Sequence, residues 1–214
     1  LQQTIATVQS IKKAVPDAKL IAVELAGVTP NEEQKRIMNE HLDVYIDLSA
    51  DPDVVGIYNS TDNWDIVKST TEVMGFSRAL EQLLNTGELE GIDRVFKISG
   101  RYIISDTFDI NQFEQLPGRI VVAQRRNSQF GPNVTGGISE QYMSRLWSWP
   151  TGRLDEVIQV YEDSLVFFAQ RLAAGGYVDI EHVLAKFLDP AHVTEIQNLG
   201  VEGCIAPNGQ PIKN

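Results

Sequence analysis

The sequence contains little of what marks several large classes of protein. Its single cysteine, Cys204, excludes an internal disulfide and cannot build a zinc site alone, which fits a reducing compartment. No stretch approaches the roughly 20 consecutive apolar residues of a membrane span, and no signal-peptide pattern opens the chain. We therefore expect a cytoplasmic protein without a membrane span.

Positive charge is scarce as well. The chain has 18 Lys and Arg residues against 29 Asp and Glu residues, a formal net charge of -11 at pH 7. This excess of acid disfavours nonspecific attraction to nucleic acid or anionic lipid, so we expect no nucleic-acid partner, and an anionic ligand would need a local basic site. No Gly-x-Gly-x-x-Gly or Walker sequence is present, which argues against a generic nucleotide-binding protein.

What is present is enough apolar chain for one core. The 214 residues stay below the roughly 250 at which a single core divides, and 43% of them are hydrophobic. We predict one domain over residues 1–214. Nothing in the sequence indicates its oligomeric state.

Short apolar runs alternate with segments of helical periodicity. We predict helices at Gln3–Ala14, from Pro30 with Thr29 as its N-cap, and at Ile66–Leu84, Leu154–Leu172, Ile180–Phe187 and His192–Leu199. We predict strands at Lys19–Leu25, Leu42–Leu48, Arg94–Ile98 and Arg119–Gln124, a further apolar run at Val54–Tyr58, a long loop at Asn127–Gly137, and two short strands around a turn at Asn208 and Gly209. This alternation is typical of an α/β domain with a largely parallel sheet.

The run VFKISGRYII breaks an apolar strand with Ser99, Gly100 and Arg101. A strand that only packed would need neither the glycine nor the arginine. Glycine permits close approach of a ligand to the backbone, and arginine offers a planar fork of donors that matches phosphate oxygens. The alternative is a surface arginine at a strand end, paired with an acid such as Asp106.

Several segments, in order, resemble one group of proteins: TVQSIKKAVPDAKLIAVE, KSTTE, KISGRY, VDIEHVLAKFL and LGVEGCIAPNGQPI. They are similar to bacterial and viral glycosyltransferase-like proteins of the GT-A fold, with KISGRY the most specific piece. The resemblance covers most of the chain and implies a Rossmann-like, mostly parallel twisted sheet with helices on both faces. It assigns 1–125 to the nucleotide sugar and 126–214 to the acceptor side, and it leads us to expect that an N-terminal strand precedes Leu1.

The implied activity is that of a glycosyltransferase (EC 2.4 class), which moves a sugar from a nucleotide-diphosphate donor such as a UDP-sugar to a glycan or other hydroxyl acceptor. Most enzymes of this fold carry Asp-x-Asp where KISGRY stands, and those carboxylates hold Mn²⁺ or Mg²⁺ on the diphosphate. Here Ser99, Gly100 and Arg101 replace them, so the metal and its ligands stay open. The alternative is a carbohydrate- or nucleotide-binding protein that keeps the fold without the activity. Asp51-Pro52-Asp53 spells the motif, but we interpret it as a turn.

The resemblance also implies roles for residues on the donor side. Lys68 would lie near the nucleotide with Glu72 as its structural partner, and Ser99 to Tyr102 would contact the donor. The alternatives are an ordinary i,i+4 pair of Lys68 and Glu72 on a solvated helix face, and a packed Tyr102 ring.

On the acceptor side, Asp179, Glu181 and His182 are candidates for removing a proton from a sugar hydroxyl. Asp179 is also a natural N-cap, and His182 is equally explained as a satisfied core histidine. Trp147 and Trp149 are candidates for stacking on the acceptor sugar, and the alternative is that both anchor the core.

Overall fold

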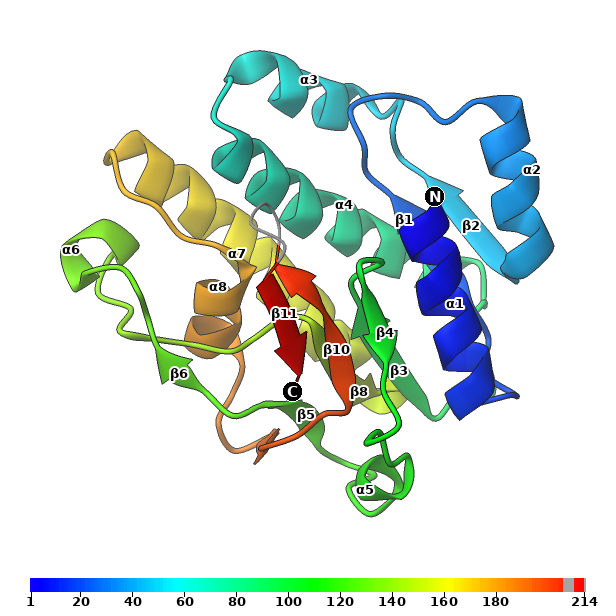
Figure 1. The fold of residues 1–214 in the computed structure, drawn as a ribbon. Helices are drawn as coiled ribbons and strands as arrows, with labels where there is room; N and C mark the ends of the chain where they lie inside the picture. The colour runs from blue at the N-terminus through cyan, green and yellow to red at the C-terminus, as the bar shows by residue number, and fades with distance from the viewer. Residues whose placement is uncertain (206–209, 214) are drawn as a thin grey trace.

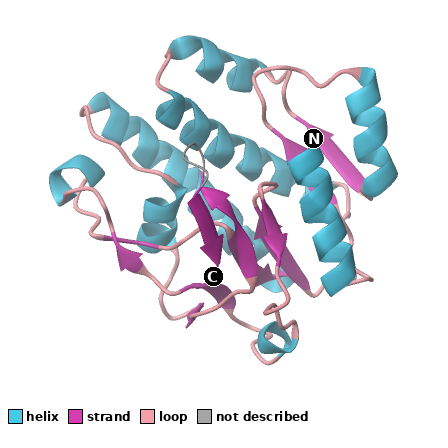
Figure 2. Cartoon of the chain, in the orientation of Figure 1, coloured by secondary structure: helices cyan, strands magenta, loops and turns pink. Residues whose placement is uncertain are grey.

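Figures 1 and 2 show a mixed α/β protein; this computed structural model describes residues 1–205 and 210–213, with side chains within 1–203. The helices are α1 (Gln2–Ala14), α2 (Glu32–His41), α3 (Pro52–Ser60), α4 (Trp64–Asn85), α5 (Asn111–Glu114), α6 (Pro132–Thr135), α7 (Leu154–Ala173) and α8 (Ile180–Phe187), with a 3₁₀ turn η1 (Thr151–Arg153). The strands are β1 (Ile21–Glu24), β2 (Val44–Asp47), β3 (Arg94–Ile98), β4 (Tyr102–Ile104), β5 (Ile120–Ala123), β6 (Arg126–Asn127), β7 (Glu140–Gln141), β8 (Leu146–Pro150), β9 (Val193–Ile196), β10 (Val201–Ile205) and β11 (Gln210–Lys213).

The described strands form several small sheets. One has the order β3-β8-β5-β9, in which β8 is antiparallel to both neighbours and β5 is parallel to β9. β1 and β2 form a separate parallel pair, and β10 is antiparallel to β4 and β11. The prediction of a largely parallel sheet is therefore wrong, because β8 enters between β3 and β5 in the opposite direction.

The main core lies where α4 and α7 pack together against the four-stranded sheet (Figure 1). Trp147, Trp149 and Tyr161 have no exposed surface there. Successive residues of a strand face opposite sides, so Leu146 turns instead to a smaller cluster that contains Phe113 and Phe96. The core therefore lies on both faces of β8.

Helix α4 follows the predicted pattern closely. Asn63 caps it through hydrogen bonds to the N–H groups of Asp65 and Ile66, and it continues to Asn85. In the middle of the helix, a Cβ at Gly75 would lie 2.1 Å from a methyl carbon of Leu25. The glycine therefore leaves room for the Leu25 side chain where α4 passes the end of β1.

Two predicted helices are wrong, one in the residue at which it begins and the other in its type. The second helix begins at Glu32, because Asn31 and Gln34 form a capping box; Thr29 is not the cap. The segment His192–Leu199 contains strand β9, because its apolar residues pair with β5 in the sheet. Tertiary pairing outweighed the local helical pattern in the second case.

The remaining predicted elements agree with the structure to different degrees. The predicted bounds of β3 and α8 are confirmed, and the run Val54–Tyr58 lies within α3. The predicted loop Asn127–Gly137 includes α6. β10 and β11 are the two predicted short strands, and they pair antiparallel. Their turn and the Cys204 side chain lie outside what the structure describes. None of the helices in the described part of the chain has the length and apolar character that a bilayer crossing needs.

Candidate functional site between β1 and β3

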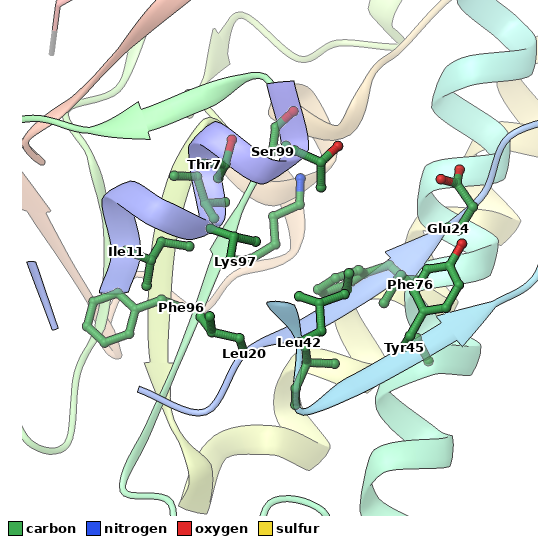
Figure 3. Close-up of a pocket in the computed structure, with 18 of the residues that line it drawn as sticks. Thr7, Ile11, Leu20, Glu24, Leu42, Tyr45, Phe76, Phe96, Lys97 and Ser99 are labelled. Carbon is green, nitrogen blue, oxygen red and sulfur yellow. The ribbon is translucent and has the colours of Figure 1, made fainter. Parts of the chain in front are cut away.

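A cavity of about 690 Å³ lies between β1 and β3; we name it the β1–β3 cavity. Helices α1 and α4 also line it, together with residues of neighbouring elements such as Tyr45 of β2 and Tyr58 of α3. Figure 3 shows Leu20, Leu42 and Phe96 toward one end, whereas Glu24 and Ser99 lie toward the other. The carboxyl ends of β1 and β3 both lie at this second end. We name this the polar end, defined by Glu24, Lys68, Ser99 and Arg101, all of which line the cavity.

Arg101 is the third residue after β3 and is exposed at the polar end. The turn is closed by the N–H groups of Arg101 and Tyr102, which donate to the Ser99 carbonyl at 2.7 and 3.0 Å. Within the described residues, the Arg101 side chain makes no ion pair or hydrogen bond. Asp106 pairs with Lys13 at 3.2 Å instead, so the alternative of an Arg101–Asp106 pair is wrong.

Ser99 and Gly100 line the same cavity. A Cβ at Gly100 would lie 3.5 Å from Thr4 Oγ1, which is an ordinary contact. The neighbouring side chains therefore do not by themselves require glycine at this position. Close approach of a ligand to this backbone stays a prediction.

Lys68 and Glu72 both line the cavity, but they do not pair with each other. Lys68 Nζ lies 3.9 Å from the exposed Asp65, whereas Glu72 Oε1 accepts a hydrogen bond from Lys97 Nζ at 2.5 Å. The alternative of a solvated i,i+4 pair is therefore wrong, and so is Glu72 as the partner of Lys68. Glu72 instead ties α4 to β3.

Lys97 and Arg145 are buried cations that were not predicted from the sequence. Lys97 Nζ also lies 5.9 Å from the Phe76 ring centroid. The Arg145 side chain is only 8% exposed, and its Nη1 atom has no hydrogen-bond partner in the described residues. The signal for both was a positive residue inside or beside an apolar run, namely VFKI and SRLWSW.

Aromatic rings line the cavity beside the polar end. Trp64 is 61% exposed, and its ring lies 6.1 Å from the ring of Tyr58, centroid to centroid. Tyr58 donates to the Leu25 carbonyl at 3.0 Å, and burial raises its pKa. Burial, and then the charges of Glu24 and Asp47, raise the pKa of Tyr45 to about 12. An exposed tryptophan at a helix start was the only sequence signal for this group.

Tyr102 is a packed ring, as the alternative interpretation predicted. It is 7% exposed, and a Cβ at Gly203 would lie 2.5 Å from its Cδ1 atom. The guanidinium of Arg145 lies 5.9 Å from the ring centroid. Tyr102 does not line the β1–β3 cavity, so its predicted contact with a donor is wrong.

Asp179 and His182 form a closed structural unit. Asp179 is the N-cap of α8 and its carboxylate lies 2.5 Å from His182 Nδ1. His182 has no exposed surface, and its Nε2 lies 2.8 Å from Ser128 Oγ. Both ring nitrogens are thus engaged inside the protein, so a catalytic His182 is wrong in this arrangement, and Asp179 is occupied as its cap and partner.

Glu181 has the most perturbed carboxyl group near the site. Burial, and then the nearby charges of Asp179 and Glu72, raise its pKa to about 7, against an ordinary value of 4.5. Ser144 Oγ donates to Glu181 Oε1 at 2.6 Å and works in the opposite direction. Glu181 does not line the β1–β3 cavity itself, but Glu72 does. A carboxyl with a pKa near neutrality can accept and return a proton.

Trp147 and Trp149 are core residues, and their predicted contact with an acceptor sugar is wrong. Both have no exposed surface, and their ring centroids lie 4.5 Å apart. They follow one another on the same face of β8, which α4 and α7 cover. Burial of both faces of β8 is what the sequence pattern alone did not reveal.

No group of three or more His, Cys, Asp and Glu residues in the described part of the chain is arranged to hold a metal ion. The carboxylates of Asp51 and Asp53 both bind Arg78, and Asp51 caps α3, so the literal Asp-x-Asp is structural. Its interpretation as a turn is wrong, because Pro52 and Asp53 are the first residues of α3.

The structure thus brings Lys68, Glu72, Ser99, Gly100 and Arg101 to one cavity. It places Tyr102, both tryptophans and His182 in packed positions away from that cavity. Five of the six residues predicted to contact the donor therefore lie at this cavity, and their contact with a donor stays a prediction. Of the residues predicted for the acceptor side, Glu181 stays a candidate. No protein-family model matches this chain, and no curated protein matches its sequence.

Proposed function

We propose that this protein is a glycosyltransferase that binds a nucleotide-diphosphate sugar at the polar end of the β1–β3 cavity. The observation that carries the proposal is the exposed Arg101, which lines the cavity without an acidic partner in the described residues. In a protein with a formal net charge of -11, an unneutralised guanidinium beside a cavity favours an anionic ligand. Ligands of α/β sheets bind beyond the carboxyl ends of strands, which is where Arg101 lies.

The donor groups follow from the chemistry of the lining. Arg101 and Lys68 are assigned to the diphosphate, because both are cations and the 3.9 Å contact of Lys68 with exposed Asp65 is weak. The exposed ring of Trp64 offers a face on which a base can stack. The GT-A-like fold is part of the same proposal and rests on the KISGRY resemblance together with the mixed α/β architecture.

Glu181 is assigned as the general base. The acceptor oxygen attacks the anomeric carbon of the donor, the bond from that carbon to the diphosphate oxygen breaks, and the electron pair stays on the diphosphate. The hydroxyl proton passes to the Glu181 carboxylate, while Arg101 and Lys68 stabilise the leaving charge. A metal ion that reaches the diphosphate would supply further charge stabilisation.

Thermal unfolding in the presence of nucleotides tests the binding step. We expect UDP or a related nucleotide diphosphate to raise the melting temperature, with and without Mn²⁺ compared in parallel, and Arg101→Ala to abolish the shift. Arg36→Ala, which removes an exposed arginine from α2 outside the cavity, is the matched control and should retain it. A flat response of the native protein to a full panel of nucleotides and nucleotide-sugars would refute the proposal.

The competing function is a noncatalytic binding protein of the same fold. It is favoured by the replacement of Asp-x-Asp and by the buried positions of Trp147, Trp149 and His182. Release of nucleotide from a donor sugar separates the two functions. If the protein is a transferase, Glu181→Gln should still bind UDP, but the rate at which it produces UDP from a donor sugar should fall by about 100-fold or more. Retention of glycans without nucleotide release from any donor would favour the binding protein.

A further inference from the structure

Strands β1 and β3 each have an edge without a partner strand in the described residues, and both edges border the β1–β3 cavity. β1 pairs with β2 alone, and β3 pairs with β8 alone. An unpaired edge presents a row of backbone N–H and C=O groups that need hydrogen-bond partners. Two such rows facing one cavity point to a missing strand between them.

The hydrogen bonds of β1 show which of its residues face the cavity. The carbonyls of Leu20 and Glu24 accept hydrogen bonds from Val44 and from the residue after β2, at 3.1 and 3.0 Å. Alternate residues of a strand turn their backbone groups to opposite neighbours. The N–H and C=O groups of Ile21 and Val23 are therefore directed away from β2, toward the cavity.

The same reasoning applies to β3. Thr151 donates to the Asp93 carbonyl, and Ser99 donates to the Arg145 carbonyl at 3.1 Å, so the odd-numbered residues of this segment bond β8. The backbone groups of Phe96 and Ile98 are directed to the other side, which is the cavity. Both edges thus offer donors and acceptors at the spacing of a strand.

Apolar side chains from two helices form much of the two faces of the cavity. Val8 and Ile11 line it from α1, and Phe76, Leu80 and Leu83 line it from α4. Figure 3 labels Ile11 and Phe76 among these residues. A strand lying between β1 and β3 would direct alternate side chains to α1 and to α4. Strands buried on both faces are continuous apolar runs, often of valine and isoleucine.

We propose that the β1–β3 cavity is a docking site for an extended, apolar polypeptide segment, which adds as a strand between β1 and β3. The segment joins the β1–β2 pair to the four-stranded sheet by main-chain hydrogen bonds on both of its edges. Its length follows from its neighbours, because β1 has 4 residues and β3 has 5. This occupant leaves the polar end free, so the inference is independent of the proposed function.

A strand fits these observations better than a compact apolar molecule does. Such a molecule would cover the side chains of α1 and α4, but it would leave the backbone groups of Ile21, Val23, Phe96 and Ile98 without partners. Buried backbone groups without partners are costly and are rare in folded proteins. Only another extended backbone supplies donors and acceptors along both edges at once.

Amide hydrogen exchange with a synthetic peptide tests the docking. The probe is acetyl-KKVIVIVKK-amide, and its matched control, acetyl-KKVIPIVKK-amide, has a central proline that removes one donor and disrupts a strand. The probe should slow exchange at Ile21, Val23, Phe96 and Ile98 by about tenfold or more, while Ala22 and Lys97, which bond existing neighbours, change little. The proline peptide should not slow amide exchange at these alternate residues.

Blocking variants provide the second measurement. Ala22→Phe and, from the α1 side, Val8→Trp place bulk at residues that line the cavity and should abolish peptide binding, whereas Ala169→Phe on the exposed surface of α7 should not. Two blocking variants keep the test informative if one does not fold.

Absence of peptide protection in the native protein overturns the proposal. It is equally overturned if decanoate or self-association protects these amides while the peptide does not. UDP binding at the polar end is scored separately, so failure of one proposal does not hide the other.

Discussion

The two sides of strand β3 differ in how completely the same kind of residue is buried. On the side of β8, Trp147 and Trp149 have no exposed surface. On the side of the β1–β3 cavity, the equally apolar Ile21, Val23 and Phe96 remain half-buried. The difference lies in the neighbours, because β8 has a strand on each edge and a helical layer on its face, whereas β3 has a strand on one edge only. An apolar sequence predicts that a segment will be buried, but it does not identify what covers it.

The largest expected effect comes from truncating a fully buried side chain on the β8 side of β3. Trp149→Ala should lower the free energy of unfolding by about 3–5 kcal/mol, because a fully buried ring is lost and a cavity is left. Val23→Ala on the cavity side should cost only about 1 kcal/mol, since its side chain is half-buried and borders space that already exists. Urea denaturation of both variants measures the comparison. Equal losses would contradict the difference between the two sides.

The ion pair between Lys97 and Glu72, which joins β3 to α4, provides the second test of this comparison. Lys97→Met should lower the free energy of unfolding by about 1–3 kcal/mol, because it leaves the partly buried Glu72 carboxylate without its donor. Adding Glu72→Gln should recover part of that loss, because the uncompensated charge is removed. Chemical denaturation of the single and double variants gives the coupling. The exposed Lys12→Met should change stability by less than about 0.5 kcal/mol.

The sequence was informative where one segment decides its own structure. The periodicity of Ile180–Phe187 and the apolar run Arg94–Ile98 predicted α8 and β3 with the correct bounds. It was misleading where a distant segment decides. Val193–Ile196 becomes a strand only because β5 lies beside it, and the direction of β8 depends on a connection that carries no local signal.

The candidate site divides in the same way. Arg101 was predictable, because a charged residue beside glycine in an apolar strand has no packing role, and the structure places it at a cavity. The roles of Trp147 and Trp149 were not, because tryptophans that stack on sugars and tryptophans that fill a core have the same sequence pattern. Which of the two occurs is decided by α4 and α7, which cover β8 from elsewhere in the chain.

A further expected effect depends on pH and concerns the Glu181 carboxyl. Its pKa in the folded protein is raised to about 7, chiefly by burial, from an ordinary value of 4.5 that applies to the unfolded chain. The folded state therefore binds this proton more tightly, and the free energy of unfolding falls as pH rises from about 4.5 to about 7. Glu181→Gln should flatten this part of the curve, and melting temperatures across the range measure it.

The slope can be assigned to Glu181 because other perturbed carboxyls act in a different window. The pKa of Glu195 is lowered by its hydrogen bonds and charge interaction with Arg125, which outweigh burial, so its stabilising contribution is lost only as pH falls below its ordinary value of 4.5. Glu195→Gln should therefore change stability on the acid side and leave the fall toward neutral pH in place. If Glu181→Gln retains the full fall between about pH 4.5 and 7, the raised pKa belongs to another group, and Glu181 loses its assignment as the base.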